Sequence, residues 1–199
     1  MNPSATSRID PQSVLDFWFG TPGSTEFGTQ RKLWFTKDDE VDRAIADRFG
    51  ATIERALRGE LDDWAATAAG ALARILLLDQ FTRNAFRGDK RAFAGDAQAL
   101  AAASAMVGLR GDELLPAFMR GFVYMPFEHA EGMAMQDEAV RLFTRLVAAA
   151  PEAGSMLDYA RRHRAVIERF GRFPHRNAIL GRQSTGGELA YLAGPGSSF

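Results

Sequence analysis

The sequence predicts an all-α fold, and three observations support this prediction. Apolar residues recur with a helical period along nearly the whole chain. No run of alternating β-branched residues is long enough to form a sheet. With 199 residues and 46% hydrophobic content, the chain is long enough to bury a substantial core without disulfides, and it contains no cysteine. We therefore expect one helical domain over residues 1–199.

The first expected helix has a clear start and a clear end. Asp10 is placed to cap it, Pro11 stands at the first helical position, and Gly20 ends it. A linker with Trp34 and Phe35 follows. With this one, the sequence predicts about eight helices; the others lie near residues 38–57, 65–86, 90–107, 113–125, 127–149, 155–170 and from 185 onward.

Local sequence signals fix two boundaries among these helices. Pro126 lacks a backbone donor and clashes with the carbonyl of Phe122, so we expect a kink or break there. Thr185 and Glu188 have the spacing of a capping box, which predicts the start of the last helix. We expect the helices between residues 38 and 170 to form three antiparallel pairs of about forty residues each, a length typical of helical repeats, although the sequence contains no strict repeat.

Composition excludes several function classes. A net charge of −1 gives no electrostatic case for nucleic acid or for an anionic membrane, and no apolar run is long enough to span a bilayer. The N-terminal residues lack the apolar region of a signal peptide, so we expect a cytoplasmic protein. The chain has no phosphate-binding Gly-Lys-Ser loop, dinucleotide fingerprint or nucleophile elbow, which argues against nucleotide chemistry.

Ionisable residues stand on helix faces that are otherwise apolar. Asp79 and Arg83 form an i, i+4 pair on the apolar stripe of the third helix, which predicts an inward ion pair. Glu128 and Glu131 continue the buried stripe of the sixth helix, where two inward carboxylates would raise each other's pKa, and His129 projects to one side. His163 lies at the centre of the apolar stripe of the seventh expected helix, residues 155–170.

The segment from residue 170 to residue 185 is rich in arginine. A short helix is expected to begin at Pro174, and its amides with the nearby guanidinium groups would suit a carboxylate or phosphate. The alternative is that these arginines neutralise Asp79, Glu128 and Glu131, because an unpaired buried carboxylate loses several kcal/mol of solvation.

A metal site is not expected, and neither is another cofactor. Helix bundles build di-metal centres from Glu-x-x-His on two helices, whereas Glu128 and Glu131 give Glu-x-x-Glu once. His129 is expected to point elsewhere, so the spacing does not match that pattern.

Several long motifs resemble one known family. They are Leu-Leu-Asp-Gln-Phe-Thr-Arg-Asn (77–84), Phe-Arg-Gly (86–88), Tyr-Met-Pro-Phe-Glu-His-Ala-Glu (124–131), Phe-Gly-Arg-Phe-Pro-His-Arg-Asn (170–177), Leu-Gly-Arg (180–182) and Pro-Gly-Ser-Ser-Phe (195–199). They resemble the bacterial domain-of-unknown-function family nine-two-four. The resemblance implies a right-handed array of helix pairs similar to tetratricopeptide-repeat proteins, and it implies no function.

Three hypotheses about function remain open. The first is a binding module whose groove holds a small anion or an acidic peptide. The second is a hydrolase or lyase with Glu128 or Glu131 as acid or base, assisted by His163 or His175. The third is a scaffold with a structural polar network and a protein partner. The candidate binding residues are Asp79, Arg83, Asn84, Arg87, Glu128, His129, Glu131, Arg172, His175, Arg176, Asn177 and Arg182.

Overall fold

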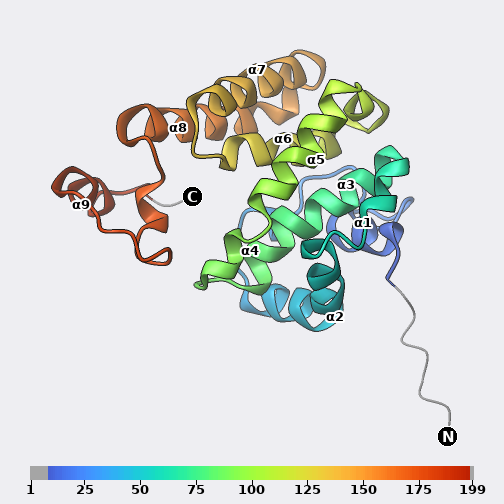
Figure 1. Ribbon diagram of the computed structural model, residues 1–199. Helices are drawn as coiled ribbons and strands as arrows, with labels where there is room; N and C mark the ends of the chain where they lie inside the picture. The colour runs from blue at the N-terminus through green and yellow to red at the C-terminus, as the bar shows by residue number, and fades with distance from the viewer. Residues whose placement is uncertain (1–8, 198–199) are drawn as a thin grey trace, which may run out of the picture.

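A computed structural model describes residues 9–197 of the chain, and across these residues every regular element is a helix (Figure 1). This confirms the predicted fold class. The α-helices are α1 (Pro11–Phe19), α2 (Asp39–Leu57), α3 (Ala68–Leu76), α4 (Thr82–Ala85), α5 (Asp96–Gly108), α6 (Ala117–His129), α7 (Met133–Ala149), α8 (Gly154–Phe170) and α9 (Gly186–Leu192).

The N-terminal helix begins and ends as the sequence predicts. Asp10 caps α1 by accepting from the Ser13 amide, and Gly20 ends it with a φ of 85°. The linker after α1 is fixed to the core because the Trp34 indole donates to the Trp18 carbonyl at 2.7 Å. This contact holds the aromatic linker against the first helix.

The helix expected over residues 65–86 is one continuous run with an irregular centre. A short 3-10 helix (Asp62–Ala66) precedes α3, and a π-helical turn (Leu77–Phe81) joins α3 to α4. Such turns often mark functional sites. The Thr82 hydroxyl donates to the carbonyls of Leu78 and Asp79, which stabilises the wide turn. Asp79 lies within this turn and is almost fully buried.

The chain does not leave the helix at Pro126, where a kink or break was expected, but four residues later. Pro126 is inside α6, which continues to His129, and the chain leaves the helix at residues 130–132. The buried Gln136 amide, on α7, donates to the carbonyls of Glu128 and Ala130 at 2.6 and 2.8 Å. These bonds satisfy backbone acceptors at the end of α6, where a helix leaves its last carbonyls unpaired.

The helix expected over residues 38–57 matches α2, whereas α5, α6 and α7 begin four to six residues later than expected. The α8 helix starts one residue before the expected one, and Thr185 and Glu188 form the capping box that begins α9. In Figure 1, α6, α7 and α8 lie together, whereas α9 stands at the edge of the molecule. Antiparallel pairing in a tetratricopeptide-repeat-like array and a single domain over residues 1–199 stay predictions.

Two groups of buried apolar residues hold the fold together. The larger joins residues from α1 through α8, and the smaller joins Val166 and Ile167 of α8 to Phe173 of the segment that leads to α9. Among the described residues, no helix combines the length and apolar character needed to cross a membrane. The N-terminal residues 1–8 and the end of the Pro-Gly-Ser-Ser-Phe motif lie outside the described residues.

Candidate functional site

Ionisable side chains from five parts of the fold meet in one network of contacts. We call them the polar cluster, which consists of Asp79, Arg83, Asp96, Glu128, His129, His163 and Arg176. Asp79 is 1% exposed, Glu128 5% and His163 4%. Because charged groups lose solvation when buried, each of these residues needs a partner.

Two carboxylate–histidine contacts form the centre of the polar cluster. Asp79 Oδ1 lies 2.7 Å from His129 Nδ1, and Glu128 Oε1 lies 2.9 Å from His163 Nδ1. The His163 Nδ1 is also 3.0 Å from the Tyr159 carbonyl. The two imidazole rings are 6.1 Å apart between centroids. The end of α6 thus places both Glu128 and His129 in the cluster, contrary to the expectation that His129 points away from the site.

Arginines link the carboxylates of the cluster. Arg83 Nη1 is 3.1 Å from Asp79 and 2.7 Å from Asp96, and Arg176 Nη1 is 3.3 Å from Asp96. The predicted inward ion pair between Asp79 and Arg83 is therefore present. Sequence analysis missed Asp96, because an acidic residue in the first turn of a helix is ordinary there.

The environment lowers the pKa of Asp79, His129 and His175. Burial opposes ionisation of Asp79, but Arg83 and His129 outweigh it and hold its pKa well below the usual range. Burial, together with the charge of Arg83, lowers the pKa of His129. Burial and the nearby Arg176 lower the pKa of His175 to about 4. A charged carboxylate thus faces a neutral imidazole across the Asp79–His129 contact near neutral pH.

Glu131 does not join Glu128 in the interior. Its carboxylate accepts from the Phe173 amide at 2.8 Å and pairs with Arg182 at 2.6 Å. Although burial works the other way, Arg182 and the Phe173 amide lower the pKa of Glu131, so the expected mutual rise is wrong for this residue. The physical reason is that α6 ends at His129, so residues 128 and 131 do not share a helical face.

Other predicted site residues lie in separate surroundings. Arg87 pairs with Asp42 at 2.5 Å, and Asn84 donates to the Gln80 carbonyl. Asn84 and Arg87 line a surface cavity of about 540 Å³. Asn177 donates to Ser184. The His175 ring lies 5.6 Å from the Phe173 ring, which in turn contacts His163, so His175 borders the polar cluster.

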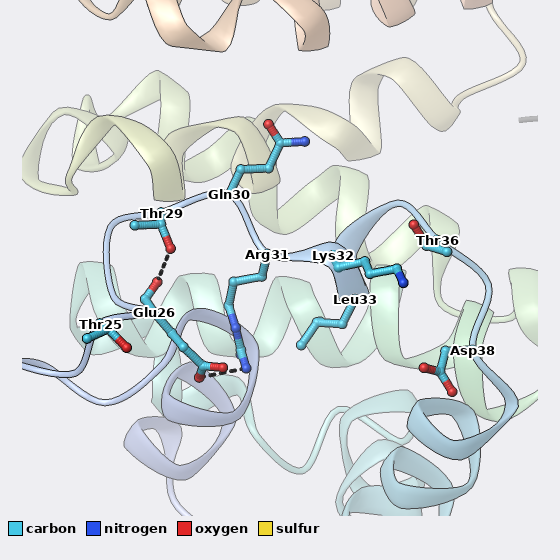
Figure 2. A pocket seen from close by; sticks show the side chains of 9 residues that line it. All are labelled: Thr25, Glu26, Thr29, Gln30, Arg31, Lys32, Leu33, Thr36 and Asp38. Atoms are coloured by element: carbon cyan, nitrogen blue, oxygen red, sulfur yellow. Dashed lines mark hydrogen bonds and ion pairs between the residues drawn. The ribbon is translucent and has the colours of Figure 1, made fainter.

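A second surface cavity, of about 400 Å³, lies in the linker between α1 and α2 (Figure 2). Within it Arg31 extends toward Glu26, and the two side chains pair at 2.9 Å. Arg31 also donates to the carbonyl of Phe17, so the pair anchors the linker to α1. Neither cavity is lined by a histidine, and the polar cluster is the stronger candidate site.

The pair between Arg172 and Glu188 allows a pH test of the C-terminal segment. Arg172 donates to Glu188 at 2.7 Å and, with the Thr185 amide, lowers the pKa of Glu188 to about 2. Because the folded pKa is lower than the unfolded one, this stabilisation is complete above about pH 4.5 and is lost as pH falls toward 2. We expect Arg172→Gln to raise the titration midpoint of the Glu188 carboxyl, measured by NMR.

The matched control for this test is Arg169→Gln, since Arg169 stacks on Phe170 instead of pairing with Glu188. It should leave the Glu188 midpoint unchanged. A wild-type midpoint near 4.5, the ordinary value, would contradict the assigned pair.

Fold and site together define an all-helical protein whose polar cluster joins the α3–α4 run, α5, α6, α8 and the segment before α9. The chain belongs to the bacterial protein family of unknown function DUF924, whose model matches residues 14–196. A solved structure of a protein of unknown function from Agrobacterium tumefaciens is similar, with 39% sequence identity and a TM-score of 0.80. The similarity covers 92% of this chain and 96% of that one. No curated protein matches.

Proposed function

We propose that this chain binds a small molecule with a carboxylate or phosphate group at the polar cluster, and that Arg176 is the anchor for that group. The observation that carries the proposal is a buried guanidinium with unused donor capacity. Arg176 is 6% exposed, and its buried Nε has no acceptor among the described residues. A buried donor without an acceptor costs about 1 to 3 kcal/mol, which a bound anion would remove.

The position of Arg176 supports this role. Its guanidinium lies 4.9 Å from the centre of the Phe93 ring and 4.5 Å from that of Phe173. Stacking on two rings holds the planar group in one orientation, which favours two-point recognition of a carboxylate or phosphate. Arg172 and Arg182, by contrast, each hold a carboxylate in a two-point pair, so they contribute less to an incoming anion.

A second candidate function is a hydrolase or lyase at the same cluster. The two carboxylate–histidine contacts favour it, because a histidine oriented by a carboxylate is a common general acid or base. In this reading His129, with Asp79 behind it, exchanges a proton with the ligand that Arg176 holds. Loss of turnover in Asp79→Asn with retained ligand binding would distinguish this function from binding alone.

The proposal is tested by a thermal-shift screen against acetate, succinate, citrate, inorganic phosphate and AMP, followed by calorimetric titration of each hit. Arg176→Lys keeps the charge but removes the planar group and its Nε, so we expect at least tenfold weaker binding. The matched control is Arg162→Gln, because Arg162 also stacks on a ring, that of Tyr159, but is exposed and outside the cluster. Equal binding by wild type and Arg176→Lys would overturn the proposal.

A further inference from the structure

We propose that Glu128, His129 and His163 bind a divalent transition-metal ion, with zinc(II) as the best match. This inference goes beyond anion binding, and it is tested with the metal alone. It starts from proximity, because each of the three residues offers a donor atom, and these atoms all lie within 4.8 Å of one another. Around a tetrahedral zinc ion with bonds of about 2.0 to 2.2 Å, donor atoms stand about 3.3 Å apart.

The distances require only a small contraction of the side chains. Glu128 Oε1 and His163 Nδ1 are 2.9 Å apart. His163 Nδ1 also lies 3.0 Å from the Tyr159 carbonyl, which can only accept, so Nδ1 carries a proton that binding of the ion would release. The remaining donor, from His129, is at most 4.8 Å from either of them. The proposed site therefore requires the donor atoms to draw together from at most 4.8 Å to about 3.3 Å.

Neighbouring groups hold the donors in the orientation that a metal site needs. Asp79 binds Nδ1 of His129, so in the proposed site Nε2 of this ring would be the donor atom. A carboxylate behind a metal-binding histidine is the usual arrangement, and it fixes the tautomer and raises the basicity of the ring. On the other side, Gln136 binds the Glu128 carbonyl and so fixes the backbone that carries Glu128 and His129.

The charges of the polar cluster also favour a cation. Three carboxylates, those of Asp79, Asp96 and Glu128, face two guanidinium groups, those of Arg83 and Arg176. Two neighbouring ion pairs add no net charge, because each joins one carboxylate to one guanidinium: Glu131 with Arg182, and Glu188 with Arg172. One negative charge therefore remains for a proton or a metal ion, and a divalent ion would turn the excess into a positive charge that suits a bound anion.

The donor set indicates the class of ion. Two imidazoles and one carboxylate suit zinc(II) and related transition metals and do not suit calcium or magnesium, which prefer oxygen. Three protein ligands leave a position for water or for a ligand oxygen, as in catalytic zinc sites. The sequence lacks the Glu-x-x-His pattern of a di-metal centre, but a site for one ion does not need that pattern. In the structure, donor atoms of Glu128 and His129 both lie within 4.8 Å of a donor atom of His163.

The experiment uses the untagged full-length chain after treatment with EDTA. Zinc(II) is titrated by calorimetry with a competing chelator, and we expect one ion per chain with a Kd below about 1 μM, or roughly −8 kcal/mol. His129→Gln should weaken binding at least 100-fold, and Asp79→Asn should weaken it about 10- to 100-fold. The control is His175→Gln, since His175 is the third histidine of the chain and is outside the donor set.

A second measurement on the wild-type chain avoids dependence on variants that fail to fold. With ¹⁵N-labelled histidine, one equivalent of zinc(II) should shift the ring nitrogens of His129 and His163 far more than those of His175. The proposal is overturned by no binding below 1 mM, by equal loss in His129→Gln and His175→Gln, or by equal ring shifts in all three histidines. If the chain binds zinc(II) but none of the tested anions, only the proposed anion-binding function is contradicted. If the metal-free chain binds an anion but no zinc(II), only the proposed metal site is contradicted.

Discussion

Replacement of Arg83 by methionine is expected to lower the free energy of unfolding by about 3 to 5 kcal/mol, the range for removing one partner of a buried ion pair. Arg83 contacts both Asp79 and Asp96, and Asp79 is 1% exposed. Methionine fills a similar volume but leaves Asp79 with two partners that carry no guanidinium charge, the His129 ring and the Gln80 amide. The carboxylate would stay buried without the guanidinium charge that now helps to hold its pKa low.

Urea denaturation at pH 7 measures this effect, and Arg87→Met is the matched control. Arg87 lies four residues further along the chain, in the turn after α4, and pairs with one carboxylate, that of Asp42. Its side chain is 40% exposed, so its pair contributes at most about 1 kcal/mol. Similar losses in the two variants would show that Arg83 behaves as a surface arginine, contrary to the structure.

A double variant separates the lost attraction from the lost packing. If the cost of Arg83→Met comes from the bare carboxylate, Asp79→Asn in the same chain should recover part of the stability, because it removes the buried charge. If the double variant is no more stable than Arg83→Met alone, the main loss is in packing around the guanidinium. The comparison follows the logic of a double-mutant cycle.

The sequence predicts the helices well because their signals are local. Asp10, Pro11 and Gly20 define α1 through capping and backbone conformation, and Thr185 with Glu188 defines the start of α9. The Asp79–Arg83 pair is also local, since four residues along a helix bring two side chains to one face. Each of these features depends on neighbours in the chain and not on the rest of the fold.

The composition of the polar cluster depends on tertiary contacts, and there sequence reasoning was only partly correct. The orientations of His129 and Glu131 follow from where α6 ends, and that boundary depends on Gln136 of the next helix. Asp96 joins the cluster because α5 packs beside the run that carries Asp79, a proximity that no spacing in the sequence encodes. Helical periodicity therefore predicted the burial of Asp79, Glu128 and His163 but not which side chains meet. For Glu131 it predicted an inward position that the structure does not show.

Replacement of Gly95 by alanine is expected to destabilise the fold by about 3 kcal/mol and to disturb the polar cluster. A Cβ on Gly95 would lie 2.1 Å from the Leu78 carbonyl oxygen and 2.9 Å from its carbon, far inside the roughly 3.5 Å at which heavy atoms attract. Backbone atoms cannot rotate away as a flexible side chain does. The φ of Gly95 is −94°, which alanine adopts freely, so the cost comes from the close approach alone.

The clash reaches the site because of its place in the chain. Leu78 precedes Asp79 in the π-helical turn, and Gly95 precedes Asp96, so the clash would push apart the two elements that Arg83 joins. Gly108→Ala is the matched control, since Gly108 is the last residue of the same helix and a Cβ there meets nothing within 4 Å. Thermal unfolding should show Gly108→Ala within about 1 kcal/mol of wild type. Equal stability of the two variants would mean that α5 can move away from the Leu78 carbonyl, and then zinc affinity in Gly95→Ala would show whether Asp79 still holds His129 in place.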